Sequence, residues 1–394
     1  MKWASALSEN PDTMTGLLEC ISEIGEKIDA NSIDLAVLFV SDDHRKEFAQ
    51  IPLLIHEKLN PRQFVGCSAG GVIGNGKEVE HSFGISLTVA SLPEINLNSF
   101  YVVDDELPDL DAPPTAWEAL VGISESKDPQ FLIITDPFTI RSQNLLLGLD
   151  YAFSKGIKIG GMASGSSPER GNTLFLGETT YRSGAVGIIF DGNIVIDPIV
   201  AQGCRPIGTP IRITKSEHNV LMQLDDRPTV EVLREIYQNL TSHDRELVRH
   251  SLFLGMVMDK FEETPQLGGF LIRNIVGIDS RSGAMIIGEK LEEGQIVQFH
   301  LRDARTSQED LHGILRNYSD KRGPIDSAGA LLFSCLGRGK YLYGSSDHDT
   351  NLFRDMVGNI PLGGFFCNGE IGPVGGTTYL HGYTSSFGIF RPRN

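Results

Sequence analysis

The segment with the clearest chemical potential is a glycine-rich stretch that begins at Gly66. Residues 66–70 read Gly-Cys-Ser-Ala-Gly, the G-x-S-x-G of a nucleophile elbow, in which a serine sits on a strained turn between a strand and a helix. The residues after it, 71–76, are rich in glycine and form helices poorly. We therefore keep a hydrolase that uses Ser68 only as an alternative, and we favour small residues that let a neighbouring strand or a ligand approach closely.

Three further patterns fall short of a reactive site. Residues 71–77 read G-x-x-x-x-G-K, but Glu78 stands where a P-loop carries the hydroxyl that holds magnesium. Cys67 has no histidine or lysine beside it in the sequence to favour its thiolate. The 10 histidines show neither HxH nor HExxH spacing, so the sequence gives no support for a bound metal.

The elements that must position these residues repeat along the chain. Three segments share one order of signals: an apolar strand, a helix-like stretch, a glycine-rich strand and a closing apolar strand. Each segment is predicted to be a β-α-β-β unit. A degenerate fourth copy begins at residue 252. The apolar first strands are residues 35–40, 131–135 and 328–335, and the glycine-rich segments are residues 64–71, 159–165 and 362–369.

The repeats predict an α/β (α+β) fold, in which duplicated β-α-β-β units form two related mixed-sheet domains. A boundary between the halves is expected near residues 220–228, where charged residues precede Pro228. We therefore predict domains at residues 1–222, with two repeats, and at residues 223–394, with one clear and one degenerate repeat.

Composition excludes several classes of protein. The chain has 394 residues and a formal net charge of −17, which disfavours nucleic-acid binding through a broad basic face. The apolar runs are too short for membrane insertion, and no secretory signal is visible. The 5 cysteines are widely separated and contain no CxxC pair, so neither a disulfide framework nor a zinc knuckle is expected. We predict a cytoplasmic protein.

Three stretches together resemble the FIST family of small-ligand sensory domains. Residues 66–74 are similar to the N-terminal signature of that family, and residues 202–228 resemble the stretch that joins its two halves. The C-terminal signature is matched by residues 364–373, followed by His381 and Thr384. One departure is Phe-Cys-Asn at residues 366–368, where tyrosine and threonine are more usual in the family, so the ligand preference of this chain is expected to differ.

The resemblance implies a FIST N-terminal and a FIST C-terminal domain that sense small molecules, with amino acids as the proposed ligands. Some members are haem-binding nitric-oxide sensors, and others carry an F-box. This sequence shows no F-box, kinase or cyclase segment, so we expect a partner protein in trans to carry any signal onward.

The small-residue clusters and one carboxylate predict a ligand site with no catalytic residue and no metal. We expect backbone amides near Gly66 and Gly161 to bind a carboxylate and Glu370 to pair with an amino group, as an amino acid requires. The predicted ligand-binding residues are Gly66, Cys67, Ser68, Gly161, Ser164, Phe366, Asn368 and Glu370.

The leading hypothesis is a non-enzymatic sensor of an amino acid or a similar metabolite, without a cofactor. The first alternative is a haem-binding gas or redox sensor with His381 or another histidine as axial ligand, or less favourably Cys67 or Cys367. The second is an adaptor without a small ligand, whose glycines only turn the strands.

Overall fold

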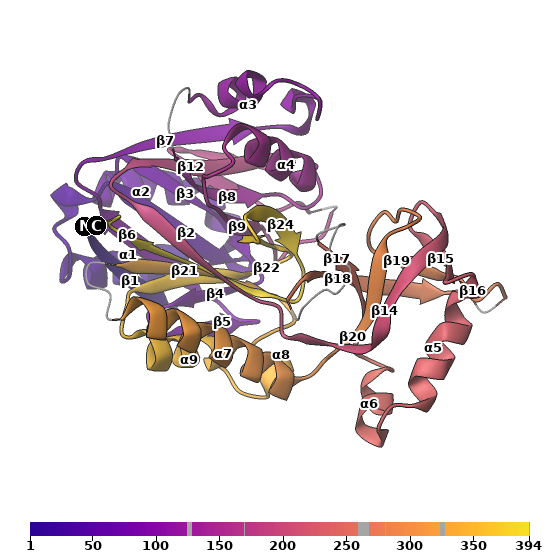
Figure 1. Cartoon of the computed structure of the whole chain (residues 1–394). Helices are drawn as coiled ribbons and strands as arrows, with labels where there is room; N and C mark the ends of the chain where they lie inside the picture. The colour runs from indigo at the N-terminus through magenta and orange to yellow at the C-terminus, as the bar shows by residue number, and fades with distance from the viewer. Residues whose placement is uncertain (124–127, 169, 259–267, 280, 324–327, 394) are drawn as a thin grey trace. The chain divides into compact units, whose positions relative to one another are not determined.

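The computed structural model describes residues 1–123, 128–168, 170–258, 268–279, 281–323 and 328–393. The chain is of mixed α/β class, as predicted. It divides into two compact units: unit 1 comprises residues 1–200 and 312–394, and unit 2 comprises residues 201–311. This division differs from the boundary predicted at residues 222 and 223, because the third repeat packs with the first two. In Figure 1 its yellow strands β21 and β22 accordingly lie among the indigo and magenta strands.

Unit 1 contains three repeats of one unit, which we call repeat 1 (residues 35–91), repeat 2 (residues 130–192) and repeat 3 (residues 329–391). In each repeat, two strands joined by a helical segment are parallel, and a last strand pairs antiparallel with the first. In order, the strands are β2 (Leu35–Ser41), β3 (Gln63–Ala69) and β6 (Ile85–Ser91); β8 (Gln130–Thr135), β9 (Lys158–Met162) and β12 (Ala185–Gly192); β21 (Gly329–Cys335), β22 (Leu362–Cys367) and β25 (Ser385–Arg391).

The first strands are central because their sequences are apolar on both faces. Every residue of β2 and of β8 is buried, as is typical of strands covered on both sides. The helical segments that follow are α4 (Ser142–Ala152) in repeat 2 and α9 (His348–Val357) in repeat 3. In repeat 1 the segment is a 3₁₀ helix, η2 (Asp42–Gln50), followed by α2 (Ile51–Leu59), and the change falls next to Pro52, which lies in the first turn of α2.

Each repeat also contains a hairpin that the β-α-β-β prediction lacked. The hairpin lies between the glycine-rich strand and the last strand, and it joins the sheet of another repeat. β4 of repeat 1 pairs with β22 of repeat 3, β10 of repeat 2 pairs with β3 of repeat 1, and β23 of repeat 3 pairs with β9 of repeat 2. The hairpin strands are β4 (Gly71–Gly74) and β5 (Lys77–Glu80), β10 (Leu174–Leu176) and β11 (Thr179–Tyr181), and β23 (Glu370–Val374) and β24 (Thr377–His381).

This exchange is cyclic, so the three sheets of unit 1 enclose one apolar core to which all three repeats contribute. Phe39 of repeat 1 stacks on Phe365 of repeat 3 with ring centroids 4.5 Å apart, and Phe333 meets both rings edge-on. Burying an aromatic side chain contributes on the order of 2 kcal/mol. The edge strands β1 (Lys2–Ser8), β7 (Ile95–Val102) and β13 (Val195–Ala201) complete the sheets.

One glycine in each repeat is required by the close approach of its two parallel strands. In register, Gly66, Gly160 and Gly364 lie opposite Leu38, Ile133 and Leu332. A Cβ atom at these glycines would lie 1.9, 1.8 and 2.0 Å from the carbonyl oxygen of the opposite residue. The glycine-rich segments therefore serve strand packing, and the three glycines define which residues of the repeats are equivalent.

Counted from these glycines, Ser68 is equivalent to Met162 and Phe366, whereas Gly70 is equivalent to Ser164 and Asn368. The two serines of the predicted site thus occupy different positions in their repeats.

Unit 2 is an antiparallel sheet in the order β14-β20-β17-β18-β19-β15-β16. The predicted fourth copy of the repeat is wrong: β17 pairs antiparallel with β18, where a repeat has a parallel pair. After β16 the chain forms the helix α5 (Thr229–Gln238). The strands are β14 (Cys204–Glu217), β15 (Val220–Leu224), β16 (Arg227–Pro228), β17 (Leu252–Val257), β18 (Phe270–Ile278), β19 (Met285–Ile287) and β20 (Ile296–Arg302).

The other helices are short apart from α1 and α7. Among the described residues, no helix is long and apolar enough to cross a bilayer. These helices are α1 (Thr13–Gly25), η1 (Ala30–Ser32), η3 (Asp104–Glu106), α3 (Pro114–Val121), α6 (Ser242–Leu247), α7 (Ala304–Arg322) and α8 (Lys340–Tyr343).

Candidate functional site

A cavity of about 690 Å³ lies in unit 1 where strand ends and loops of the three repeats meet. Its lining mixes small residues, contributed by all three repeats, with charged residues from repeats 1 and 2. The small or neutral lining residues are Ala69, Gly70, Gly165, Ser166, Leu336 and Asn368, and the charged or titratable ones are Asp42, Asp43, Arg45, Lys46, His81 and Arg170.

Ser164 connects the three repeats directly beneath this cavity. Its hydroxyl accepts a hydrogen bond from the Gly70 N–H at 2.8 Å and donates one to the carbonyl oxygen of Phe366 at 2.5 Å. The Asn368 side-chain amide donates to the carbonyl oxygen of Ala163 at 3.0 Å. Because Ser164 is fully buried, its hydroxyl acts as a fixed structural link.

The turn after Ser164 needs glycine. Gly165 has φ of +88°, and a Cβ atom there would lie 2.5 Å from the carbonyl oxygen of Ala69. A side chain would therefore be strained and would collide with the backbone of repeat 1. The close approach of repeats 1 and 2 at the cavity depends on this residue.

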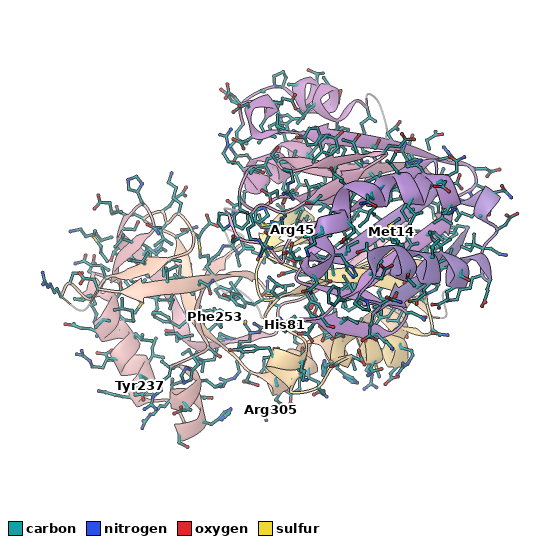
Figure 2. The ribbon with its side chains drawn as sticks, turned by 180° about the vertical axis from the view of Figure 1, so that it is seen from behind. Met14, Arg45, His81, Tyr237, Phe253 and Arg305 are labelled. Carbon is teal, nitrogen blue, oxygen red and sulfur yellow. The ribbon has the colours of Figure 1, made fainter. Side chains whose placement is uncertain are left out.

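The charged part of the lining is organised around Arg45 (Figure 2). Its guanidinium donates to Asp42 Oδ1, to the Ser166 hydroxyl and to the carbonyl oxygens of Arg170 and Gly171. These bonds tie η2 of repeat 1 to the loop after β9 in repeat 2. The Nε atom of Arg45 is buried and has no hydrogen-bond partner in the described part of the chain.

The cavity therefore presents charges of both signs. Arg170 lies 3.7 Å from Asp42, and its side chain is 64% exposed. Lys46 and Asp43 are also exposed. Sequence reasoning missed these charged residues, because a charged run after a strand is read as a helix start and nothing local shows that it faces another repeat.

Ser68 lies below the cavity and is fully buried. Its hydroxyl donates to the carbonyl oxygen of Ser164 at 3.5 Å and accepts from the N–H of Thr173 at 3.0 Å. Both partners are backbone groups, whereas a nucleophilic serine requires a base within hydrogen-bond reach.

The remaining predicted site residues lie in strands below the lining. Cys67 and Phe366 are buried, and burial raises the pKa of the Cys67 thiol well above its usual range. Gly66 packs against Leu38, as described above. The structure thus brings Asn368 to the cavity lining and places Ser164 directly beneath it, bonded to the lining residue Gly70. Gly66, Cys67, Ser68 and Phe366 do not line the cavity.

Gly161 and Glu370 are paired with each other in the β9–β23 ladder. The Glu370 side chain is fully buried. Its Oε2 accepts the Thr384 N–H at 3.0 Å, and its Oε1 lies 3.5 Å from the thiol of Cys367. The carboxylate thus points into the protein and not into the cavity. The ligand-binding roles of Gly161 and Glu370 stay predictions.

The surroundings of His381 do not fit a haem. His381 is 3% exposed, and its Nε2 lies 2.9 Å from the carbonyl oxygen of Gly372. The nitrogen that would bind iron is thus held inside a hairpin. Among the described residues, no group of three or more histidine, cysteine or acidic side chains is arranged to hold a metal ion.

Comparison with known proteins identifies relatives of the whole chain. The FIST N domain matches residues 34–227, and the FIST C domain matches residues 230–373. An uncharacterised protein of Mycobacterium tuberculosis strain H37Rv is 33% identical over 394 residues, covering 99% of this chain and 100% of that protein. An uncharacterised protein of Mycobacterium bovis is 31% identical over 393 residues, covering 99% of each chain.

Among solved structures, a cyanuric acid hydrolase from A. caulinodans aligns over 100% of both chains, with a TM-score of 0.37 and 9% sequence identity.

Proposed function

We propose that this chain, which belongs to the FIST family, is a non-enzymatic sensor of a small zwitterionic metabolite such as an amino acid. In this proposal the chain is cytoplasmic, has no cofactor, and passes its signal to a partner protein. The observation that carries the proposal is the cavity at which the three repeats meet, because a ligand bound there would contact all three.

The charges at the cavity support an amino acid as the ligand. Arg170 and Lys46 could bind a carboxylate. The Arg45 Nε–H is a buried donor that has no partner among the residues the structure describes. Asp43 could bind an ammonium group on the same ligand. A cavity of about 690 Å³ accommodates a molecule of this size and leaves room for ordered water.

The position of the cavity suggests how binding becomes a signal. A bound ligand would add contacts between η2 of repeat 1 and the loop after β9 of repeat 2, and these contacts would favour one arrangement of the repeats. A partner protein that binds this arrangement preferentially would then respond to the presence of the ligand.

A thermal-shift titration of the full chain with the common amino acids tests the proposal. A ligand at about a hundred times its dissociation constant stabilises the folded state by about 2.7 kcal/mol, which corresponds to a shift on the order of 5 °C. We expect a shift with one chemical class of amino acids, and no shift with the corresponding amines, which lack the carboxylate.

Two lining variants and one control locate the binding site. Lys46→Gln and Arg170→Gln change exposed side chains, and each is expected to weaken binding about tenfold or more, because a hydrogen bond to a charged group contributes about 1.5–3 kcal/mol. Arg62→Gln removes a half-exposed arginine that pairs with Asp34 outside the cavity, and it should leave affinity unchanged. A flat response to every amino acid would contradict the proposal and favour an adaptor without a small ligand.

A further inference from the structure

Two cysteines occupy paired positions at the ends of the parallel strands of repeat 3. Cys335 ends β21 and Cys367 ends β22, and the two residues are directly opposite in the register. Adjacent strands are about 4.8 Å apart, which is within the range of Cα separations that a disulfide spans. Partners in register carry their side chains on one face, here the face of Phe333 and Phe365. Both cysteines are thiols in this structure.

The two thiols differ in their access to solvent. Cys335 is partly exposed, whereas Cys367 is fully buried, so an oxidant that arrives from solvent meets Cys335 first. Burial, and then the negative charge of Glu370, raise the pKa of Cys367 well above its usual range. Cys367 therefore keeps its proton until a base removes it.

A buried arginine lies next to Cys335. The backbone N–H of Arg338 donates to the carbonyl oxygen of Cys335 at 2.8 Å. Burial alone would lower the pKa of Arg338, but the carboxylate of Asp349, which lies 3.0 Å from Arg338 Nε, raises it well above its usual range. The Gly337 N–H also donates to Cys335 Sγ at 3.5 Å. The sulfur therefore lies beside a hydrogen-bond donor and close in sequence to a buried positive charge. Oxidants react with the thiolate form of a cysteine.

A base lies next to Cys367. The Cys367 thiol lies within hydrogen-bond distance of two acceptors, the Ser334 carbonyl oxygen at 3.4 Å and Glu370 Oε1 at 3.5 Å. The other Glu370 oxygen accepts the Thr384 N–H. The carboxylate is thus oriented to receive the Cys367 proton. A peroxide-driven disulfide needs a thiol that the oxidant can reach and a second thiol that can attack it. Cys335 and Cys367 are placed for these two roles, with a cation near the first thiol and a base beside the second.

We propose that Cys335 and Cys367 form a reversible disulfide when the protein meets a hydroperoxide. The Cys335 thiolate attacks a peroxide oxygen; an S–O bond forms, the O–O bond breaks, and hydroxide leaves. Glu370 takes the proton of Cys367, and the resulting thiolate attacks the Cys335 sulfenic acid. The S–S bond forms, and the departing hydroxide takes the proton from Glu370 to become water. The two thiols lose two electrons, which the peroxide gains, and an external dithiol reverses the reaction.

The residues that follow the two cysteines, Leu336 and Asn368, line the cavity described above. A bond between Cys335 and Cys367 would therefore act on the cavity floor. The disulfide itself requires no ligand, so this proposal stands whether or not an amino acid binds.

Peptide mapping of the full chain tests the proposal. The reduced protein is treated with a few equivalents of hydrogen peroxide, blocked with N-ethylmaleimide and digested with trypsin. Cys335 then lies in the peptide of residues 323–338, Cys367 in that of residues 355–393, and Cys67 in that of residues 63–77. We expect a cross-link between the first two peptides that a dithiol removes. Trapped sulfenic acid at Cys335 without a cross-link, or a cross-link of Cys367 to Cys67, would overturn the proposal.

Three variants separate the steps. Cys335→Ser should abolish the cross-link, and Cys67→Ala, which changes a buried thiol of the same core, should leave its rate unchanged. Glu370→Gln should slow the cross-link about tenfold or more, while sulfenic acid trapped by dimedone at Cys335 accumulates. An unchanged rate in Glu370→Gln would contradict the role of Glu370. If that variant does not fold, Cys335→Ser and Cys67→Ala still decide the pairing.

Discussion

The two units of this protein assemble their sheets in opposite ways. In unit 1, sheets are completed by strands from distant repeats: Gly74 of β4 pairs with Gly363 of β22. In unit 2, several pairings join strands that follow one another, such as β17 with β18 and β14 with β15. Unit 1 therefore closes only when all three repeats are present, and its cavity exists only after that closure. Pairings between distant segments carry a larger chain-entropy cost and form late.

The largest expected difference between the units concerns glycine. In unit 1, Gly160→Ala places a Cβ atom 1.8 Å from the Ile133 carbonyl oxygen, and we expect a loss of about 4 kcal/mol or more in the free energy of unfolding. In unit 2, a Cβ atom at Gly277 meets nothing nearer than 4.0 Å, so Gly277→Ala should change stability by less than about 1 kcal/mol. Urea unfolding with peptide-resolved hydrogen exchange measures both. Equal effects would contradict the difference in strand packing.

Glu78 is expected to make the stability of unit 1 fall as the pH rises through neutrality. Burial, and then the negative charge of Asp349, raise its pKa to about 8, whereas in the unfolded chain it ionises near 4.5. Between these values the folded protein holds a proton that the unfolded chain has released, so stability falls as pH rises from about 5 to 8. The effect should amount to a few kcal/mol.

Glu78→Gln tests this assignment. The variant keeps the acceptor for the Thr350 N–H, which lies 2.8 Å from Glu78 Oε1, and cannot ionise. Its melting temperature should vary less between pH 5 and pH 8 than that of the parent chain, and should exceed the parent value at pH 8. The same slope in both proteins would show that another group is responsible.

His300 gives unit 2 the opposite dependence. Burial lowers its pKa to about 4 from the usual 6.5, although a hydrogen bond to the Gln298 carbonyl acts in the other direction. The unfolded chain then binds a proton that the folded protein excludes, so stability is lost as pH falls from about 6.5 to 4. The loss should reach roughly 3 kcal/mol. His300→Asn should remove this acid sensitivity from the exchange of unit 2 peptides and leave that of unit 1 peptides unchanged.

The smallest expected difference between the units is in the stability lost when a buried serine of each unit is replaced by alanine. The Ser164 hydroxyl bonds to repeats 1 and 3, whereas among the described residues the Ser307 hydroxyl has one hydrogen bond, to the Gly203 carbonyl at 2.8 Å. We expect Ser164→Ala to cost about 2 kcal/mol and Ser307→Ala about 1 kcal/mol. Denaturant titration measures both losses of unfolding free energy. A larger loss for Ser307→Ala would contradict the proposal that the Ser164 hydroxyl is an important link between the repeats.

Much of the secondary structure was predictable because it depends on neighbouring residues. The apolar runs that became β2 and β8 are buried along their length, and that of β21 is buried except at its last residue, Cys335. The glycine-rich segments fall on β3, β9 and β22. The three-fold repetition followed from the order of these signals alone. The degenerate fourth copy failed because similar short apolar runs also suit an antiparallel sheet.

The site was less predictable, because its parts meet only in three dimensions. Asn368 was identified from the small-residue clusters and lines the cavity, and Ser164, identified in the same way, is bonded to the lining residue Gly70. Arg45 and Arg170 were missed, since their 125-residue separation hides the bond between the Arg45 guanidinium and the Arg170 carbonyl.

The amino-acid sequence by itself determined the strands, the helices and their repetition, because hydrophobic periodicity and glycine act over a few residues. Tertiary structure alone decided which sheet each hairpin joins, which charges face the cavity, and that Glu370 points at Cys367 instead of at solvent. These features depend on burial and on pairing between repeats. Both are properties of the closed core, and no local segment carries them.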